Sequence, residues 1–213
     1  MKFLPGSFFQ RHHLEVARDL IGTVLQWGPC SGIVVETEAY AAAGDEACHT
    51  ASRPSTRKFM ETNPAGAAYV YLNYGMYWLT NVLVKGGGSG GGDGIILIRA
   101  LEPLHGIPRM KRRRGRENLT DLCSGPGKLS MALGIRGGHH GERLAARERS
   151  GKQTRGFTFR PPALENPDIV TDTRIGISKA RELPWRFLLR DCPHVSVPPG
   201  KGAASHGSTL SNL

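Results

Sequence analysis

Hydrophobic residues recur with a helical spacing in one short segment near the start of the chain and with an extended spacing in several segments that follow. Between Leu14 and Leu20 they fall on one face of a helix and Gly22 ends the pattern, so we predict a helix over 14–20. Alternating or continuous apolar runs predict strands at 23–25, 31–40, 69–74, 77–85 and 95–101.

The remaining segments divide into helices, weaker strands and irregular regions. Helices are predicted at 104–114, 119–122 and 128–133, and weaker strands at 169–170, 174–177 and 187–190. Small residues and Pro dominate 41–68, which predicts a long irregular segment, and the glycines of 86–94 predict a flexible hairpin tip. Because strands precede helices instead of alternating with them, the order favours a mixed α+β domain.

Length and composition bound the class of protein. The 213 residues support one sizeable core, and we predict a single domain over 1–197 and a disordered tail over 198–213. The apolar runs are far shorter than the roughly 20 residues that cross a bilayer, which excludes a helical membrane protein. Pro5 and Gly6 interrupt the start before a signal sequence could form, so we expect an intracellular location with no secretion signal.

The charge balance indicates a polyanionic partner. The 28 Lys and Arg residues exceed the 18 Asp and Glu residues, which gives a formal net charge of +10. This favours DNA, RNA or an anionic membrane surface, because basic side chains displace counterions from phosphates. An ordinary basic protein is the alternative. The densest basic run, 111–116, has too few spaced apolar residues for a membrane-binding helix.

The cysteines offer no metal-binding motif. Cys30, Cys48, Cys123 and Cys192 form no CxxC pair, and we expect them to be reduced because no export signal is recognised. Only Cys48 has a neighbouring histidine, so no metal site is predicted.

Two carboxylates lie in the strand predicted at 31–40. Because alternate side chains of a strand share a face, Glu36, Glu38 and Tyr40 lie on one side. In an edge strand this side would be solvated. In a buried strand, a carboxylate beneath an aromatic-lined cleft would suit a general base or the stabilisation of a cationic transition state. The residues alone leave both interpretations open.

Tyrosines cluster at the break between two predicted strands. Four of the five tyrosines fall within 69–77, and the fifth is Tyr40. Such a cluster is typical of a core or a cross-strand ladder. Beside a basic surface it could instead stack on nucleic-acid bases, and Tyr74, which precedes Gly75 and Met76, would suit a protruding wedge.

Other polar residues stand in or next to apolar runs. Asn81 lies within a predicted strand, and Arg99 follows four apolar residues, where it either reaches solvent or grips a phosphate. The segment 123–129 lacks the spacing of a nucleotide-binding P-loop. The helix that begins there could still present backbone N–H groups to a DNA phosphate.

Five segments occur along the chain in one order: ETEAY (36–40), DEACH (45–49), AYVYLNYGMYWLTN (68–81), LIRALEP (97–103) and CSGPGKL (123–129). Together they resemble the alkyladenine (3-methyladenine) DNA glycosylases. The resemblance implies one α+β domain with a curved antiparallel sheet flanked by helices. It also implies a monofunctional hydrolase that cuts the N-glycosidic bond of damaged purines without a metal or cofactor. Segments 57–60 and 86–94 depart from the family's pattern.

The resemblance also implies roles at the damaged base. Glu38 corresponds to the general base. Arg99 corresponds to the residue that holds the target phosphate and helps to fix the attacking water. The implied pocket residues are Tyr40, His49, Tyr71 and Asn81. Of these, Asn81 would clash with the 2-amino group of normal guanine.

At the duplex, the resemblance places Tyr74 in the gap left by the extruded nucleotide. Met76 and Tyr77 beside it, together with Arg57 and Lys128, are predicted to contact the DNA. The expected partner is double-stranded DNA with damaged purines, bound by a monomer. The residues do not choose among 3-methyladenine, 7-methylguanine, hypoxanthine and ethenoadenine.

Two other functions are compatible with the sequence. One is a non-catalytic protein that binds damaged DNA or RNA on the same fold, and it predicts that substitution of Glu38 has no effect. The other is a basic RNA-binding module, which competition between hypoxanthine-containing duplex DNA and a hairpin RNA would reveal.

Overall fold

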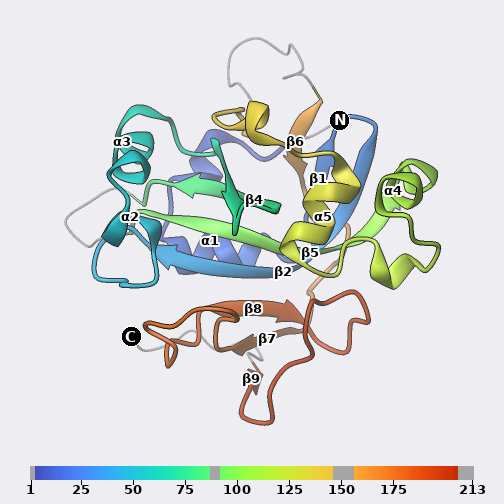
Figure 1. Cartoon of the computed structure of the whole chain (residues 1–213). Helices are drawn as coiled ribbons and strands as arrows, with labels where there is room; N and C mark the ends of the chain where they lie inside the picture. Colours follow the sequence, from blue (N-terminus) through green and yellow to red (C-terminus); the bar gives the residue numbers. More distant parts are fainter. Residues whose placement is uncertain (1–2, 87–91, 146–155, 206–213) are drawn as a thin grey trace.

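A curled antiparallel sheet carries the long hydrophobic runs of the chain (Figure 1). The computed structural model describes residues 3–86, 92–145 and 156–205. Within them the strands are β1 (Val24–Trp27), β2 (Cys30–Ala41), β3 (Ala68–Asn73), β4 (Tyr77–Val84), β5 (Gly94–His105), β6 (Phe157–Arg160), β7 (Ile169–Asp172), β8 (Arg186–Leu189) and β9 (Ala204–Ser205). The main path is β3-β4-β5-β2-β8-β7-β9, while β1 pairs with β2 and with β6.

Five α-helices of the described residues flank this sheet. They are α1 (His13–Asp19), α2 (His49–Ser52), α3 (Pro54–Thr62), α4 (Ile107–Arg114) and α5 (Pro126–Leu133), and short 3-10 turns occupy Gly6–Phe9, Leu119–Asp121 and Gly137–His139. Proline stands in the first turn of α3, α4 and α5, where its fixed φ suits a helix start. Figure 1 shows α2 and α3 near one end of the sheet and α4 and α5 near the other. The predicted α+β class is confirmed.

The longest pairing, between β2 and β5, forms the centre of the sheet. Irregular register on either side of Glu36 bends β2 at this point. Gly32 allows the two strands to approach, because a Cβ there would lie 2.8 Å from the carbonyl oxygen of Glu102. The sequence prediction of strands at 31–40 and 95–101 is therefore confirmed, and both strands extend beyond the predicted limits.

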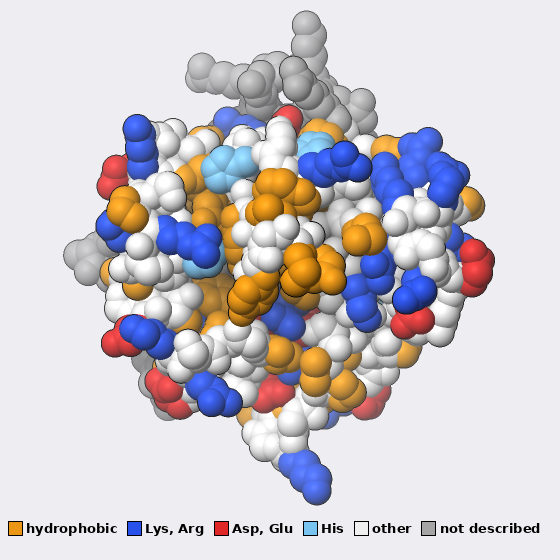
Figure 2. Space-filling model, in the orientation of Figure 1, with side chains coloured by type: hydrophobic (Ala, Val, Ile, Leu, Met, Phe, Trp, Pro, Cys, Tyr) orange, Lys and Arg blue, Asp and Glu red, His pale blue; other side chains and the backbone are white. Residues whose placement is uncertain are grey.

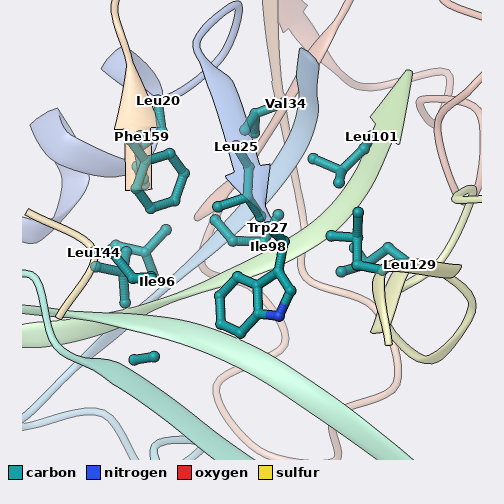
Figure 3. Packing of buried hydrophobic residues seen from close by; sticks show 14 of the residues in the cluster. Leu20, Leu25, Trp27, Val34, Ile96, Ile98, Leu101, Leu129, Leu144 and Phe159 are labelled. Carbon is teal, nitrogen blue, oxygen red and sulfur yellow. The ribbon is translucent and has the colours of Figure 1, made fainter. Parts of the chain in front are cut away.

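The main core packs helices against the inner face of the sheet. Trp27, Phe159 and Leu25 come from β1 and β6, Ile98 comes from β5, and Leu129 comes from α5, as Figure 3 shows. All five side chains are buried. Full burial of a large apolar side chain stabilises the fold by about 1.5–3 kcal/mol, so this cluster holds the sheet rigid behind the polar residues described below.

Two sequence predictions are wrong. The segment 41–68, predicted as irregular, contains α2 and α3, and in α3 the buried Thr56, Phe59 and Met60 form one helical face. The segment 174–177 is not a strand. Its first residue, Arg174, is bound through its side chain to Asp45, which holds the segment as a loop.

Further predictions concern the C-terminal end of the chain and the hairpin tip at 86–94. β9 pairs with β7, although a disordered tail is predicted from residue 198; the predicted tail residues 206–213 lie outside the described residues. Most of the predicted hairpin tip, 87–91, also lies outside them. β6 was not predicted from the sequence. No helix in the described ranges combines the length and hydropathy needed to cross a bilayer.

Candidate active site

The two carboxylates of β2 lie in the interior of the sheet. Glu36 and Glu38 are both 0% exposed, and β2 is paired with β5 on one side and β8 on the other. The interpretation of this strand as a solvated edge is therefore wrong. It failed because β8 comes from residues 186–189, far along the chain, which no local pattern relates to β2.

Each oxygen of Glu38 accepts hydrogen bonds. Tyr40 donates its hydroxyl to Oε2 over 2.8 Å, and Arg99 donates Nη1–H to the same atom over 3.2 Å. Oε1 accepts the backbone N–H of Ile175 over 2.7 Å. Every one of these partners is a donor, so the site is built around the ionised carboxylate.

A cavity of about 450 Å³ lies next to the hydrogen-bond partners of this carboxylate. Tyr40, Arg99 and Ile175, the three partners of Glu38, all line it, whereas Glu38 itself is fully buried. The other lining residues are Ala47, His49, Arg53, Tyr71, Asn73, Tyr74, Leu79, Asn81, Ile95, Leu97, Pro126, Gly176 and Ile177. This volume lies in the range of small-molecule sites.

Aromatic side chains form one wall of the cavity. The ring of His49 lies edge-on to Tyr71, with 4.4 Å between centroids, and its Nδ1 is 3.1 Å from the hydroxyl of Tyr69. Burial, and after it the charge of Arg53, lowers the pKa of His49 to about 4. Burial raises the pKa of Tyr71 to about 12 and also raises the pKa of Tyr40, which the charge of Glu38 raises further. The wall is therefore uncharged at neutral pH.

Asn81 contributes an oriented amide to the cavity. It is 2% exposed, and its Nδ2 donates to the backbone oxygen of Tyr69 over 3.0 Å. β4 sits between β3 and β5, which places Asn81 opposite Tyr69 on one side and Leu97 on the other. The amide is thus fixed by the sheet and cannot turn freely.

The guanidinium of Arg99 is bound on all three of its nitrogens. Nε donates to Glu36 over 3.0 Å, Nη1 donates to Glu38 over 3.2 Å and Nη2 donates to the hydroxyl of Ser196 over 3.1 Å. The residue is 6% exposed and lines the cavity, and three of its five N–H donors are bound within the chain. Its contacts hold it against Glu38.

A second ion pair joins two loops around the cavity. Arg174 donates to both carboxylate oxygens of Asp45, over 2.6 and 3.0 Å, and both side chains are fully buried. Its guanidinium also lies 4.7 Å from the centroid of the Tyr40 ring. Sequence reasoning assigned no role to this pair. The only signal was that Asp45 lies in the segment DEACH (45–49), which resembles the family.

The turn between β3 and β4 stands at the mouth of the cavity. Tyr74 is 80% exposed and has a φ of 50°, a conformation that a bulky residue adopts at a cost. Met76 and Tyr77 are 66% and 47% exposed. Figure 2 shows hydrophobic side chains grouped near the middle of this face, with Lys and Arg around them. Asn73 and Tyr74 also line the cavity.

The basic residues predicted to contact DNA, Arg57 and Lys128, lie in two different helices, α3 and α5. Lys128 is exposed in α5, and its Nζ is 3.3 Å from the hydroxyl of Ser124. Arg57 donates to the backbone oxygen of Thr50 within the α2–α3 unit. Arg53, which the sequence analysis did not single out, lines the cavity and lies 5.6 Å from the centroid of the Tyr71 ring.

The chemistry of this site rests on carboxylate, guanidinium and aromatic groups. Across the three described ranges, no group of three or more His, Cys, Asp or Glu side chains is placed to hold a metal ion. All four cysteines are free thiols, as the sequence predicts.

Comparison with known proteins identifies the family. The model of the family described as "Methylpurine-DNA glycosylase" matches residues 7–193. The chain belongs to the methylpurine-DNA glycosylase family. It is therefore a DNA glycosylase, a hydrolase of DNA repair, and the resemblance stated from its motifs is confirmed.

Curated relatives agree over most of the chain. A protein of Rhodopseudomonas palustris (strain BisB18) is 44% identical over 92% of this chain and 91% of its own length. Proteins of Rubrobacter xylanophilus (85% and 90% covered) and Agrobacterium fabrum (91% and 92% covered) are also 44% identical. All three are named "Putative 3-methyladenine DNA glycosylase".

Proposed function

We propose that this DNA glycosylase releases alkylated or deaminated purines from double-stranded DNA, with Glu38 as the general base. The candidates are 3-methyladenine, 7-methylguanine, hypoxanthine and ethenoadenine. The observation that carries the proposal is a buried carboxylate whose three hydrogen-bond donors, Tyr40, Arg99 and Ile175, all line an aromatic-walled cavity.

The target nucleotide rotates out of the duplex into the cavity. Extrusion costs a few kcal/mol, and less for a damaged base. Stacking on aromatic side chains is worth about 1–3 kcal/mol per base, so the cavity wall together with Tyr74 in the vacated gap offsets this cost. Because Tyr40, His49 and Tyr71 carry no charge at neutral pH, their rings suit an electron-poor or cationic purine.

Water then attacks C1′ of the extruded nucleotide. An ionised carboxylate has about four acceptor positions, and the described residues occupy three of those of Glu38. The fourth is the position proposed for the water, on the side of the cavity that Arg99 and Ile175 line. Glu38 accepts a proton, the water oxygen bonds to C1′, and the base leaves with the electron pair of the N-glycosidic bond. General-base help contributes about 10²–10⁴ in rate, and the carboxylate also stabilises the oxocarbenium-like sugar.

The product is an abasic site in an unbroken strand. No lysine is among the described residues that line the cavity, so the amine that a covalent Schiff-base step needs is not at hand. The strand that carries the abasic site is therefore expected to break only on treatment with alkali.

The test is base release from duplexes that each carry one of the four lesions. E38Q should bind the duplex with nearly wild-type affinity and release base at least about 10²-fold more slowly. E61Q changes an exposed glutamate of α3 in the same way and should leave release unchanged. Release by E38Q at the wild-type rate contradicts the proposal. Duplex binding by the wild type without any release favours the non-catalytic alternative.

A further inference from the structure

Glu36, two residues before Glu38 in β2, is a second buried carboxylate, and the proposed reaction does not use it. Oε1 of Glu36 accepts Nε–H of Arg99 over 3.0 Å, Nε–H of Arg186 over 2.7 Å and the hydroxyl of Ser196 over 2.8 Å. Oε2 accepts the backbone N–H of Ser196 over 2.6 Å. Glu36 is 0% exposed, and its donors come from β5, from β8 and from the segment after β8.

These contacts fix the direction in which Arg99 points. Glu36 takes its Nε and Ser196 takes its Nη2, which leaves Nη1 aimed at Oε2 of Glu38. Arg186 is held in turn by Asp172 over 3.1 Å and by the backbone oxygen of Val197. Ser196 lies beyond residue 193, where the match to the family model ends.

The cluster around Glu38 holds the carboxylates of Glu36, Glu38 and Asp172 and the guanidiniums of Arg99 and Arg186. Arg99 faces Glu38 from β5, Tyr40 faces it from its own strand, and the N–H of Ile175 faces it from the loop after β7. Arg99 and Arg186 face Glu36, with Asp172 of β7 behind Arg186. The more distant titratable groups are Tyr71, which interacts with Glu38, and Cys192, which interacts with Glu36. Asp45 and Arg174 form a separate neutral pair beside Tyr40.

We propose that Glu36, Arg186 and Ser196 are positioning residues that hold Arg99 against Glu38 and set the electrostatic balance at the proposed general base. This inference rests on the proposed role of Glu38. It adds that removal of one charge from the cluster shifts the pH range of base release, and that the direction depends on the sign of the charge removed.

The two charge-removing variants should act in opposite directions. E36Q removes a negative charge next to Arg99, whose guanidinium then has Glu38 as its only carboxylate partner. This favours the charged form of Glu38, so the acid limb of the pH–rate profile moves to lower pH. In R186Q, two carboxylates share the guanidinium of Arg99, so the limb moves to higher pH. The double variant E36Q/R186Q restores the balance and should return the limb towards the wild-type position.

Ser196→Ala removes two hydrogen bonds without changing charge. It should lower the plateau rate several-fold and leave the acid limb in place, because Arg99 loses one anchor and the cluster keeps its balance. Arg190→Gln is the matched control, since Arg190 forms an exposed ion pair with Asp168 just after β8 and should change neither quantity.

The measurement is single-turnover base release across pH, on the lesion that the wild type releases fastest. Wild-type release and its loss in E38Q establish the proposed function first, so failure there is distinguishable from failure of this inference. Circular dichroism reports the folded fraction. If E36Q or R186Q does not fold, the double variant and Ser196→Ala provide the test of the inference. The inference is supported when Ser196→Ala lowers the plateau and either the two charge variants shift the limb in opposite directions or the folded double variant has the wild-type limb. Shifts of the same sign, no shifts, or a wild-type plateau in Ser196→Ala overturn it.

Discussion

The carboxylate floor of the cavity and the turn at its mouth depart from ordinary protein packing in opposite ways. We use floor for Arg99, which lines the cavity, together with Glu36, Glu38 and Arg186 buried behind it. The described residues give each of these four charges a charged partner. The turn, residues 73–77, exposes large hydrophobic side chains on a basic surface. Burial of charge is costly unless it is paired, and exposed apolar patches mark interaction sites. We infer that the floor positions the side chains of the proposed reaction and that the turn contacts a partner.

The largest expected effect is on the stability of the region around the floor. R174M removes one member of the fully buried pair with Asp45, which leaves an uncompensated charge, so the free energy of unfolding should fall by about 3–5 kcal/mol. Urea denaturation measures it. The exposed pair of Arg190 and Asp168 provides the control, because R190M should cost about 1 kcal/mol or less. Equal losses in the two variants would contradict the contrast between buried and exposed pairs.

The turn should show the reverse behaviour. Y74G removes an exposed ring and relieves a φ of 50°, so the free energy of unfolding should stay constant or rise by about 1 kcal/mol. Binding to lesion-containing duplex should weaken by about 1–3 kcal/mol because a stacking contact is lost. Fluorescence anisotropy of a labelled duplex measures the affinity. A stability loss above about 1 kcal/mol with unchanged binding would assign Tyr74 to the fold instead of to the DNA.

Asn81 lies between the two regions and should show a smaller effect. N81S shortens an amide that is fixed to Tyr69, which should cost about 1 kcal/mol of stability and open the cavity to the 2-amino group of guanine. Release of undamaged guanine should then rise relative to release of hypoxanthine. Asn63 makes the same kind of bond to Phe59 outside the cavity, so N63S should leave that ratio unchanged. A ratio that rises equally in both variants would remove Asn81 from substrate selection.

The sequence predicts those parts of this design that arise from short-range patterns. The long strands follow from alternating or continuous hydrophobicity, and Glu38 and Tyr40 meet because they are two residues apart in one strand. The exposed turn is indicated by Gly75 and Met76 after a tyrosine-rich strand. Each of these features depends on residues that are neighbours in the chain.

The features that the sequence does not predict depend on contacts between residues that are distant in the chain. Asp45 and Arg174 are 129 positions apart, and Glu36 and Ser196 are 160 positions apart. No periodicity relates such residues, so the sequence could not show that β2 is internal or that its carboxylates are matched by guanidiniums. The short α2 escaped prediction because a four-residue helix has no room for an amphipathic repeat.

The last expected effect is the smallest at neutral pH, where it vanishes, and concerns the pH response of the cavity wall. Burial lowers the pKa of His49 to about 4, below its usual 6.5. The unfolded chain therefore binds a proton first as the pH falls, and the contribution of His49 to stability is complete above pH 6.5 and is lost progressively towards pH 4. H49N should leave the pH dependence of unfolding unchanged between pH 6.5 and 8 and flatten it below. Urea denaturation across pH measures both ranges. A wild-type inflection near pH 6.5 in base release that H49N abolishes would show a charged His49 in the working enzyme, and the uncharged wall proposed for a cationic purine would then be wrong.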